Sequence, residues 1–577
     1  MNAVLVLLIG IAILVIAYFT YGKWLSTQWG VDEKRPTPAH ELEDGVDYVP
    51  AKVPVLMGHH FSSIAGAGPI NGPIQAAVFG WVPVMLWILI GGIFFGAVHD
   101  YGALFASIRH KGQSIGEVIA ANIGSRAKKL FIIFSYLTLI LVVAAFAAIV
   151  AGTFAISYDK TTGEVLAAAT ETNASVAMIS LLFIVMAVIF GFAVYRRGVS
   201  IGIATVVGIV GIIVCLVIGL NFHPIYLDSN IWMILLGIYI LIASVAPVWI
   251  LLQPRDYLSS FLLYGMIIVA VVGIIGAGLM GQNLDMQIPA FTGFVDTMTE
   301  SSLGTLFPAL FVTIACGAIS GFHSLVGSGT TAKQLDREQD ARPIAYGGML
   351  IECALALISL CAVGYVWTEF SARTLTTPTL VFSHGLARMV ATIPGLAGTQ
   401  AVVQSLLVLA VSVFCLTSLD TATRLARYMF QEFWLKPGET YKDVNGVRKV
   451  LCNPYVSTAI TVVIGIALGM GGYSTIWPLF GAANQLLAAL ALLAVAAWLG
   501  NIGRNNKMFL FPMAFMLVVT LTSLVQTIMA KIRVIGTNGV TAAPAIQAGL
   551  AAVLFVLAII LAIEGIQTLV KHEKAEK

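Results

Sequence analysis

Apolar segments long enough to cross a bilayer recur along this chain and constrain its fold more than any other feature. Of the 577 residues, 59% are hydrophobic and only 10% are charged, whereas a soluble domain carries about 25% charged residues. A transmembrane helix needs about 20 mainly apolar residues. The sequence therefore predicts an all-α polytopic membrane protein, and we expect a lipid bilayer around it and no nucleic acid as a partner.

The positions of the apolar segments predict about 15 transmembrane helices. The first begins near the N-terminus and lacks the basic start of a signal peptide, so we expect the protein to retain it. The predicted helices are 2–22, 56–77, 79–107, 129–156, 174–194, 199–220, 230–252, 258–281, 305–328, 344–367, 400–429, 453–471, 474–499, 508–530 and 544–569.

The distribution of basic residues predicts how these helices are oriented. Loops rich in Lys and Arg face the cytoplasm. With the N-terminus outside, the predicted cytoplasmic loops hold 26 of the 31 Lys and Arg residues. An odd number of helices then places the C-terminus in the cytoplasm, so we predict a multi-pass protein with its N-terminus outside.

Two glycine-containing segments resemble each other and lie in helices of opposite predicted direction. Ser63–Gly68 reads SIAGAG and Ser324–Gly329 reads SLVGSG, with the serine and both glycines at the same spacing. Glycine weakens a helix, and the backbone groups that an interruption frees are tolerated at membrane depth only where they line a cavity or bind something. We therefore predict two interrupted, antiparallel helices that form an inverted repeat, although small residues that permit close helix packing remain the alternative.

The interrupted helices supply most of the predicted substrate-binding residues. The N-terminus of a half-helix can hold an anion through its free N–H groups, and free carbonyls can hold a cation. The candidates from the two segments are Ser62, Ser63, Gly66, Gly68, His323, Ser324 and Gly327. Arg255 is a further candidate because a guanidinium can bind a carboxylate with two hydrogen bonds, or it is an interfacial basic residue.

Five separated blocks of this sequence resemble the carbon starvation protein A (CstA) family. They read GHHFSSIAGAGPINGPIQAA, APVWILLQPRDYLSSFL, FPALFVTIACGAISGFHSLVGSGTTAKQL, FCLTSLDTATRLARYMFQE and TIWPLFGAANQLLAAL. The resemblance implies secondary uptake of peptides or of pyruvate across the bacterial inner membrane during carbon starvation, as a stress response, with protons as the expected driving ion. It also implies membership of the amino acid–polyamine–cation superfamily, whose fold contains a leucine-transporter-like inverted repeat.

The resemblance also suggests how the chain is divided. Residues 1–55 would hold the first helix and a cytoplasmic loop, 56–500 the transporter core, and 501–577 the C-terminal helices. Within the core, the repeats would cover about 56–220 and 305–500, with an inserted helix pair at about 230–281. The helix at 56–77 would be the first core helix and that at 400–429 the eighth, while either 305–328 or 230–252 would be the sixth.

Titratable residues inside the predicted helices are candidates for ion coupling. His59 and His60 point about 100° apart on a helix, so we expect them to face different surroundings, and histidine titrates near physiological pH. Glu352 has no basic residue one turn away, which favours a proton-relay role, and an interhelical hydrogen bond is the alternative. Asp100 is either functional or bonded to Arg109, because carboxylates inside a membrane are costly.

A polar stretch in the helix at 400–429 completes the candidate set. Asp420 and Arg424 are four residues apart, which predicts an ion pair on one helix. The resemblance to related symporters makes Ser418 and Thr421 candidates for a cation site against the first core helix. Because these hydroxyls could bind sodium, sodium coupling remains the alternative to proton coupling.

The sequence thus predicts a symporter for a small carboxylate or a peptide and not an enzyme. It contains no HExxH or CxxCH motif, so we expect neither a metal nor another cofactor. A channel-like or sensor-like homologue of the same fold is the alternative, although a sensor would normally carry a signalling domain.

Overall fold

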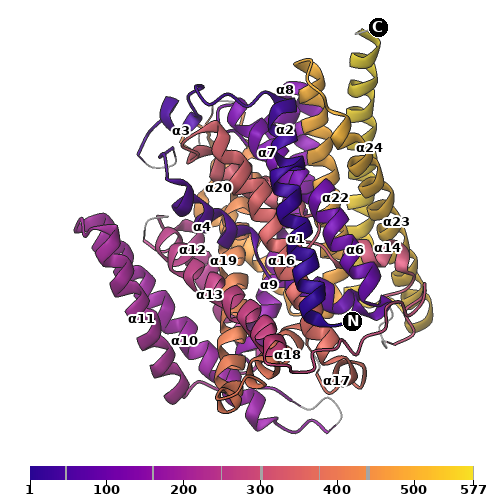
Figure 1. The fold of residues 1–577 in the computed structure, drawn as a ribbon. Helices are drawn as coiled ribbons and strands as arrows, with labels where there is room; N and C mark the ends of the chain where they lie inside the picture. The colour runs from indigo at the N-terminus through magenta and orange to yellow at the C-terminus, as the bar shows by residue number, and fades with distance from the viewer. Residues whose placement is uncertain are drawn as a thin grey trace.

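The protein is a bundle of long helices, as Figure 1 shows. This computed structural model describes residues 1–45, 48–158, 162–247, 250–298, 303–375, 377–436, 439 and 442–575. Its first twelve α-helices are α1 (Ala3–Phe19), α2 (Tyr21–Trp29), α3 (Pro38–Glu41), α4 (Val53–Ile64), α5 (Gly68–Ala76), α6 (Trp81–Gly91), α7 (Ala97–Arg109), α8 (Ile115–Asn122), α9 (Ser125–Phe154), α10 (Ala167–Gly191), α11 (Ile201–Asn221) and α12 (Ser229–Val245). The others are α13 (Leu252–Leu279), α14 (Leu306–Thr313), α15 (Gly321–Gly329), α16 (Gly348–Tyr365), α17 (Trp367–Ser371), α18 (Pro378–Ala391), α19 (Gln400–Trp434), α20 (Gly446–Leu451), α21 (Pro454–Gly469), α22 (Tyr473–Asn501), α23 (Lys507–Asn538) and α24 (Ala542–Ala575).

The prediction of an all-α polytopic membrane protein is confirmed. Within the described residues, 11 helices are long and apolar enough to cross a membrane, and α12 and α21 are shorter apolar helices. The pairs α4–α5 and α14–α15 are helices divided in two, so no half reaches the length of a span. The expected total of about 15 transmembrane helices stays a prediction.

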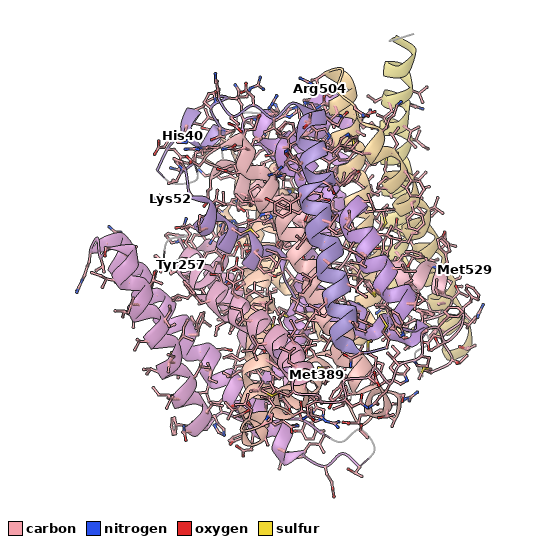
Figure 2. The ribbon with its side chains drawn as sticks, viewed as in Figure 1. His40, Lys52, Tyr257, Met389, Arg504 and Met529 are labelled. Atoms are coloured by element: carbon pink, nitrogen blue, oxygen red, sulfur yellow. The ribbon has the colours of Figure 1, made fainter. Side chains whose placement is uncertain are left out.

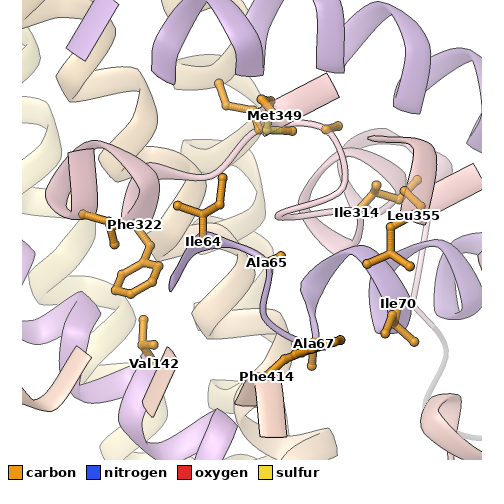
Figure 3. Packing of buried hydrophobic residues seen from close by; sticks show 14 of the residues in the cluster. Ile64, Ala65, Ala67, Ile70, Val142, Ile314, Phe322, Met349, Leu355 and Phe414 are labelled. Atoms are coloured by element: carbon orange, nitrogen blue, oxygen red, sulfur yellow. The ribbon is translucent and has the colours of Figure 1, made fainter. Parts of the chain in front are cut away.

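The first interruption lies where the sequence predicted it. Helix α4 ends at Ile64 and α5 begins at Gly68, with Ala65 in a non-helical conformation between them. Figure 3 shows Ile64, Ala65 and Ala67 among packed apolar side chains, and all three are buried. The interruption is therefore held inside the protein, away from the lipid.

The second interruption lies earlier in the chain than predicted. Gly327 is inside the continuous helix α15, whereas the break between α14 and α15 spans residues 314–320, which read IACGAIS. Two adjacent side chains of α22 explain this position. Asn484 Oδ1 accepts from the N–H of Phe322 at 2.9 Å, and Gln485 Nε2 donates to the carbonyl of Phe311 at 2.5 Å. These side chains satisfy backbone groups at the start of α15 and the end of α14.

The two interrupted helices run in opposite directions, as predicted. At one end, the N–H of Ala51, just before α4, donates to the carbonyl of Gln334, just after α15, at 2.9 Å. At the other end, the N–H of Trp81, just after α5, donates to the carbonyl of Pro289, which precedes α14, at 3.1 Å. One helix therefore begins where the other ends.

The region 230–252 contains no comparable interrupted helix in its described part. Helix α12 ends at Val245 and a separate helix, α13, begins at Leu252. Residues 248–249, which belong to the proposed proline-broken stretch, lie outside the described residues. The observed break between α14 and α15 therefore favours 305–328 as the second interrupted core helix.

Helices α12 and α13 pack among the core helices. Gly237 of α12 lies against Ile466 of α21, and Ser62 of α4 donates to the carbonyl of Asp256 in α13 at 3.3 Å. Figure 1 instead shows α11 at the edge of the bundle, beside α10. The predicted division of the core, with an inserted helix pair at about 230–281, stays a prediction.

Two segments predicted to be cytoplasmic, those that contain His40 and Arg504, lie at the same end of the bundle. Figure 2 shows His40 and Arg504 in its upper part and Met389 of α18 in its lower part. Asn505 Nδ2 donates to Gln28 Oε1 at 3.1 Å, so the loop after α22 contacts the last turn of α2. Figure 1 places the C-terminus at this end and the N-terminus at the other.

Candidate functional site

Four buried titratable residues form a chain beside the second interruption, which we call the acid–histidine chain. Its members are His99 and Asp100 of α7, His323 of α15 and Glu352 of α16. His323 Nδ1 lies 2.7 Å from Asp100 Oδ2, and His99 Nδ1 lies 2.7 Å from Asp100 Oδ1. His323 Nε2 lies 3.4 Å from Glu352 Oε2. The four groups thus connect α7, α15 and α16.

Glu352 is the least satisfied member of the acid–histidine chain. Its relative exposure is 0%, and among the described residues neither carboxylate oxygen accepts a hydrogen bond. Its polar contact is with His323, whose Nε2 lies 3.4 Å from Glu352 Oε2. A carboxylate in such surroundings is costly unless it is paired or carries a proton.

A second buried group, which we call the arginine cluster, lies beside the first interrupted helix. Arg255 Nη1 donates to Asp420 Oδ2 of α19 and to Tyr239 Oη of α12, the latter at 2.6 Å. Tyr239 Oη in turn donates to Asp420 Oδ2 at 2.8 Å. Arg255 Nη2 lies 3.1 Å from Asp256 Oδ1, and His59 Nδ1 of α4 lies 3.5 Å from Asp256 Oδ2. This cluster joins α4, α12, α13 and α19.

The predicted ion pair between Asp420 and Arg424 is wrong because tertiary partners replace the neighbours along the chain. Asp420 pairs with Arg255, while Arg424 Nη2 donates to the carbonyls of Ala243 and Ala246 at 2.9 Å each. The alternative bond between Asp100 and Arg109 is also absent, because Asp100 contacts the two histidines and Arg109 pairs with Glu338.

The two adjacent histidines face different surroundings, as the helical geometry predicted. His59 faces Asp256 of the arginine cluster, whereas His60 Nδ1 lies 2.8 Å from Thr331 Oγ1, just after α15. His60 therefore links the two interrupted helices directly. The remaining ring nitrogen of His60 has no hydrogen-bond partner among the described residues.

The predicted serines mostly bond within their own helices. Ser62 donates to the carbonyl of Gly58 at 2.7 Å and Ser63 to that of His59 at 2.9 Å. Ser324 donates to the carbonyl of Gly321 at 2.7 Å. In this conformation the donor of each hydroxyl is satisfied by a carbonyl of its own half-helix.

The predicted contact between the helices at 56–77 and 400–429 is present. Ser418 of α19 donates to the carbonyl of Ser63 at 3.4 Å, and a side-chain carbon added at Gly66 would lie 3.1 Å from Ser418 Oγ. Thr421 Oγ1 is buried without a hydrogen-bond partner among the described residues. Oxygens of both helices therefore lie close together at the first interruption.

Sequence reasoning did not single out Tyr239 and Asp256 as members of the arginine cluster. It also did not single out Cys316 as a neighbour of the acid–histidine chain. Tyr239 and Asp256 carry polar groups within or at the end of apolar segments, which was the available signal. Cys316 Sγ, His323 and Glu352 offer potential metal-ligand atoms within 4.8 Å of one another. The prediction of no metal rested on motifs, and this set adds Glu352 of α16 to two residues of the second interrupted helix.

Gly68 and Cys316 bring the two interruptions into contact. A side-chain carbon added at Gly68 would lie 2.4 Å from Cys316 Cβ. We expect Gly68→Ala to destabilise the protein by about 1–3 kcal/mol, which is the usual cost of overpacking, and Gly68→Leu to abolish uptake. Thermal unfolding in detergent and uptake into proteoliposomes measure the two effects.

A second substitution tests whether this contact is the cause. Cys316→Gly removes the opposing atom, so the double variant should recover part of the stability lost in Gly68→Ala. Gly265→Ala is the matched control, because nothing lies within 4 Å of the added carbon there. Equal losses in Gly68→Ala and Gly265→Ala would contradict the proposed contact.

Two antiparallel interrupted helices, packed in a bundle of apolar helices with buried charged groups between them, are the architecture of inverted-repeat membrane transporters. The chain matches the family described as "Carbon starvation protein CstA" over residues 2–372 and 366–523, and it belongs to that family.

Curated relatives agree with this assignment. The chain is 33% identical to the peptide transporter CstA of Bacillus subtilis over 90% of this chain and 89% of that protein. It is 34% identical to the peptide transporter CstA of Escherichia coli, covering 90% and 80% of the two chains. It is 32% identical to the pyruvate/proton symporter BtsT of Escherichia coli, covering 85% and 76%.

Solved structures give more distant matches. A crystal structure of the Eremococcus coleocola manganese transporter aligns with a TM-score of 0.47 and 12% identity, over 91% of this chain and 99% of that one. The structure of MhsT with L-phenylalanine aligns with a TM-score of 0.46 and 13% identity, over 88% and 99%.

Proposed function

We propose that this protein is a secondary transporter that takes up a small carboxylate such as pyruvate, or peptides, together with protons. The observation that carries the proposal is the acid–histidine chain, which places Glu352, His323 and Asp100 in contact beside the second interruption. A proton-coupled carrier needs a group that binds and releases a proton as the helices rearrange. The names of the curated relatives support both substrate classes, and that of BtsT supports the proton.

The substrate would bind where the two interrupted helices meet. The proposed contacts are the backbone and hydroxyl groups of Ser62, Ser63, Gly66 and Gly68 in the first helix. The corresponding groups of the second helix are those of His323 and Ser324, whereas Gly327 lies inside the continuous helix α15. Arg255 is held by Asp420 and Asp256 in this conformation, so it would bind a substrate carboxylate only after exchanging one of these partners.

The proton would move through the titratable residues of the two clusters. Glu352 and Asp100 would act with His323, and His59 and His60 would act on the first interrupted helix. Asp420 would hold Arg255. The transporter would lie in the bacterial inner membrane with its N-terminus outside and its C-terminus in the cytoplasm.

Sodium coupling is the second candidate, because one observation favours it. The hydroxyl of Ser418 in α19 lies 3.4 Å from the carbonyl of Ser63 in α4, and the hydroxyl of Thr421, three residues further along α19, has no hydrogen-bond partner among the described residues. Oxygen ligands of this kind suit a hard cation. The two candidates differ in which gradient drives uptake.

Uptake into proteoliposomes under separate gradients tests the proposal. With pyruvate and a panel of peptides, we expect accumulation when the external pH is lowered, acidification of the interior, and full activity without sodium. Counterflow of labelled substrate distinguishes a carrier from a channel. Accumulation that requires sodium and ignores the proton gradient would overturn proton coupling, and Ser418→Ala would then be expected to abolish it.

A further inference from the structure

An apolar groove lies between α1, α4, α13 and α16 at the surface of the helix bundle. Its volume is about 450 Å³, which falls within the range of roughly 300–1,000 Å³ seen for ligand sites. Helices α1 and α16 form two of its walls, and α4 and α13 contribute the others. Residues that line it include Leu14, Phe19, Met57, Ile267, Leu350 and Ile358.

The groove is long enough to extend through the hydrocarbon of one leaflet of a bilayer. It follows the polypeptide from Pro343 to Ile358, a distance of about 22 Å at the helical rise of 1.5 Å per residue. The hydrocarbon of one leaflet is roughly 15 Å thick. Val15 and Phe19 line the groove and are 48% and 66% exposed, so the groove opens on the outer face of the bundle, where lipid would surround it.

The side chain of a basic residue, Arg342, lies at one end of this groove. Arg342 directly precedes the lining residue Pro343, and its guanidinium lies 5.2 Å from the ring centre of Tyr18, which also lines the groove. Arg342 forms no ion pair with any described residue, and its Nε is buried without a hydrogen-bond partner. An unpaired guanidinium beside an apolar channel suits an anionic group joined to a long apolar chain.

We propose that the groove binds one acyl chain of an acidic phospholipid, with the lipid phosphate on Arg342. The loop before α16 contacts the segment before α4 through the bond between Ala51 and Gln334, so Arg342 lies at the end of the bundle where the predicted cytoplasmic loops meet. The phosphate would therefore sit at the headgroup level of that leaflet. The acyl chain would reach Ile358 near the middle of the membrane.

The lipid would also touch a half-helix of the first interrupted helix. Met57 of α4 lines the groove, and His60 lies one turn further along the same helix. A side-chain carbon added at Gly348 of α16 would lie 3.6 Å from His60 and 3.9 Å from Met57. The occupied groove would thus support the packing of α4 on α16. The binding itself does not depend on which substrate or ion the protein carries.

Native mass spectrometry of the delipidated full-length protein tests the proposal, with phosphatidylglycerol and phosphatidylcholine of the same acyl chains as probes. We expect the protein to bind phosphatidylglycerol about tenfold more tightly. Arg342→Ala should remove this preference and leave phosphatidylcholine binding unchanged, while Arg342→Lys should keep most of it. Arg337→Ala is the matched control, because this side chain is 64% exposed at the same end of the bundle and should have no effect.

A photoactivatable phosphatidylglycerol gives a second measurement that needs no variant. Its acyl chain should crosslink to peptides of α1 and α16, and added phosphatidylglycerol should compete. Equal binding of the two lipids would mean a groove for any acyl chain and would overturn the proposal. An equal loss in Arg337→Ala and Arg342→Ala would mean general surface charge, and crosslinks confined to other helices would place the lipid elsewhere.

Discussion

Replacing Glu352 by glutamine should abolish uphill accumulation of substrate and spare exchange. A carrier that moves one monocarboxylate with one proton accumulates it about tenfold for each pH unit of gradient, since one unit corresponds to about 1.4 kcal/mol. Glutamine keeps the size of the side chain but cannot release a proton. The accumulation ratio should therefore fall from about ten to about one under a gradient of one pH unit.

Exchange of labelled for unlabelled substrate needs no net proton movement, so it separates loss of coupling from loss of folding. Glu352 makes its polar contact with His323, and the bond between His323 and Asp100 does not involve it. The Glu352→Gln protein should therefore retain the rest of the acid–histidine chain. The two measurements are counterflow and accumulation in the same proteoliposomes.

Glu171→Gln is the matched control for this experiment. Its side chain is 58% exposed and pairs with His223 at 2.6 Å, at the edge of the bundle formed by α10 and α11. Accumulation by this variant should equal that of the wild type. Normal accumulation by the Glu352→Gln protein would exclude Glu352 as the coupling group and make His60→Gln the next variant to test.

Asp420→Asn should lower the stability of the protein by about 3 kcal/mol, and Arg255→Met should lower it more. Removing one partner of a buried ion pair costs about 3–5 kcal/mol because it leaves a charge without compensation. Arg255 retains Asp256 when Asp420 is neutralised, which favours the lower part of that range. Loss of Arg255 instead leaves two buried carboxylates, Asp420 and Asp256. Thermal unfolding in detergent gives the order of the two effects.

A double variant tests whether Arg255 is the true partner of Asp420. Arg255→Met with Asp420→Leu removes both charges of the pair, so it should unfold at a higher temperature than Arg255→Met alone. Arg126→Met serves as the control, because this exposed pair with Glu564 is worth little. Strong coupling of Asp420 to Arg424, with none to Arg255, would contradict the observed arrangement.

Hydropathy and glycine placement determined much of the fold from sequence. The apolar segments predicted an all-α membrane bundle, and the SIAGAG segment predicted the first interruption between Ile64 and Gly68. The opposite directions of the two interrupted helices followed from counting the spans between them. The separation of His59 from His60 followed from the helical rotation per residue. All of these features depend on local helix formation or on the apolarity of a segment. Residues close together in the sequence determine both properties.

Tertiary structure decided which polar groups meet. The glycines of Ser324–Gly329 resemble those of the first interruption, yet α15 is continuous through Gly327. Asn484 and Gln485 of α22 satisfy the backbone at residues 311 and 322 instead, and this moves the break earlier. Sequence similarity between the two segments could not reveal caps that come from another helix.

The same reason explains why the predicted ion pair between Asp420 and Arg424 is wrong. Spacing along a helix favoured Asp420 with Arg424, but a buried charge pairs with whichever opposite charge the packing brings closest, and that was Arg255 of α13. His323, Asp100 and Glu352 were each recognised as candidates, whereas their contact depends on how α7, α15 and α16 pack. Local sequence determined where the chain could be helical and apolar, and the packing of distant helices determined the partners of its buried charges.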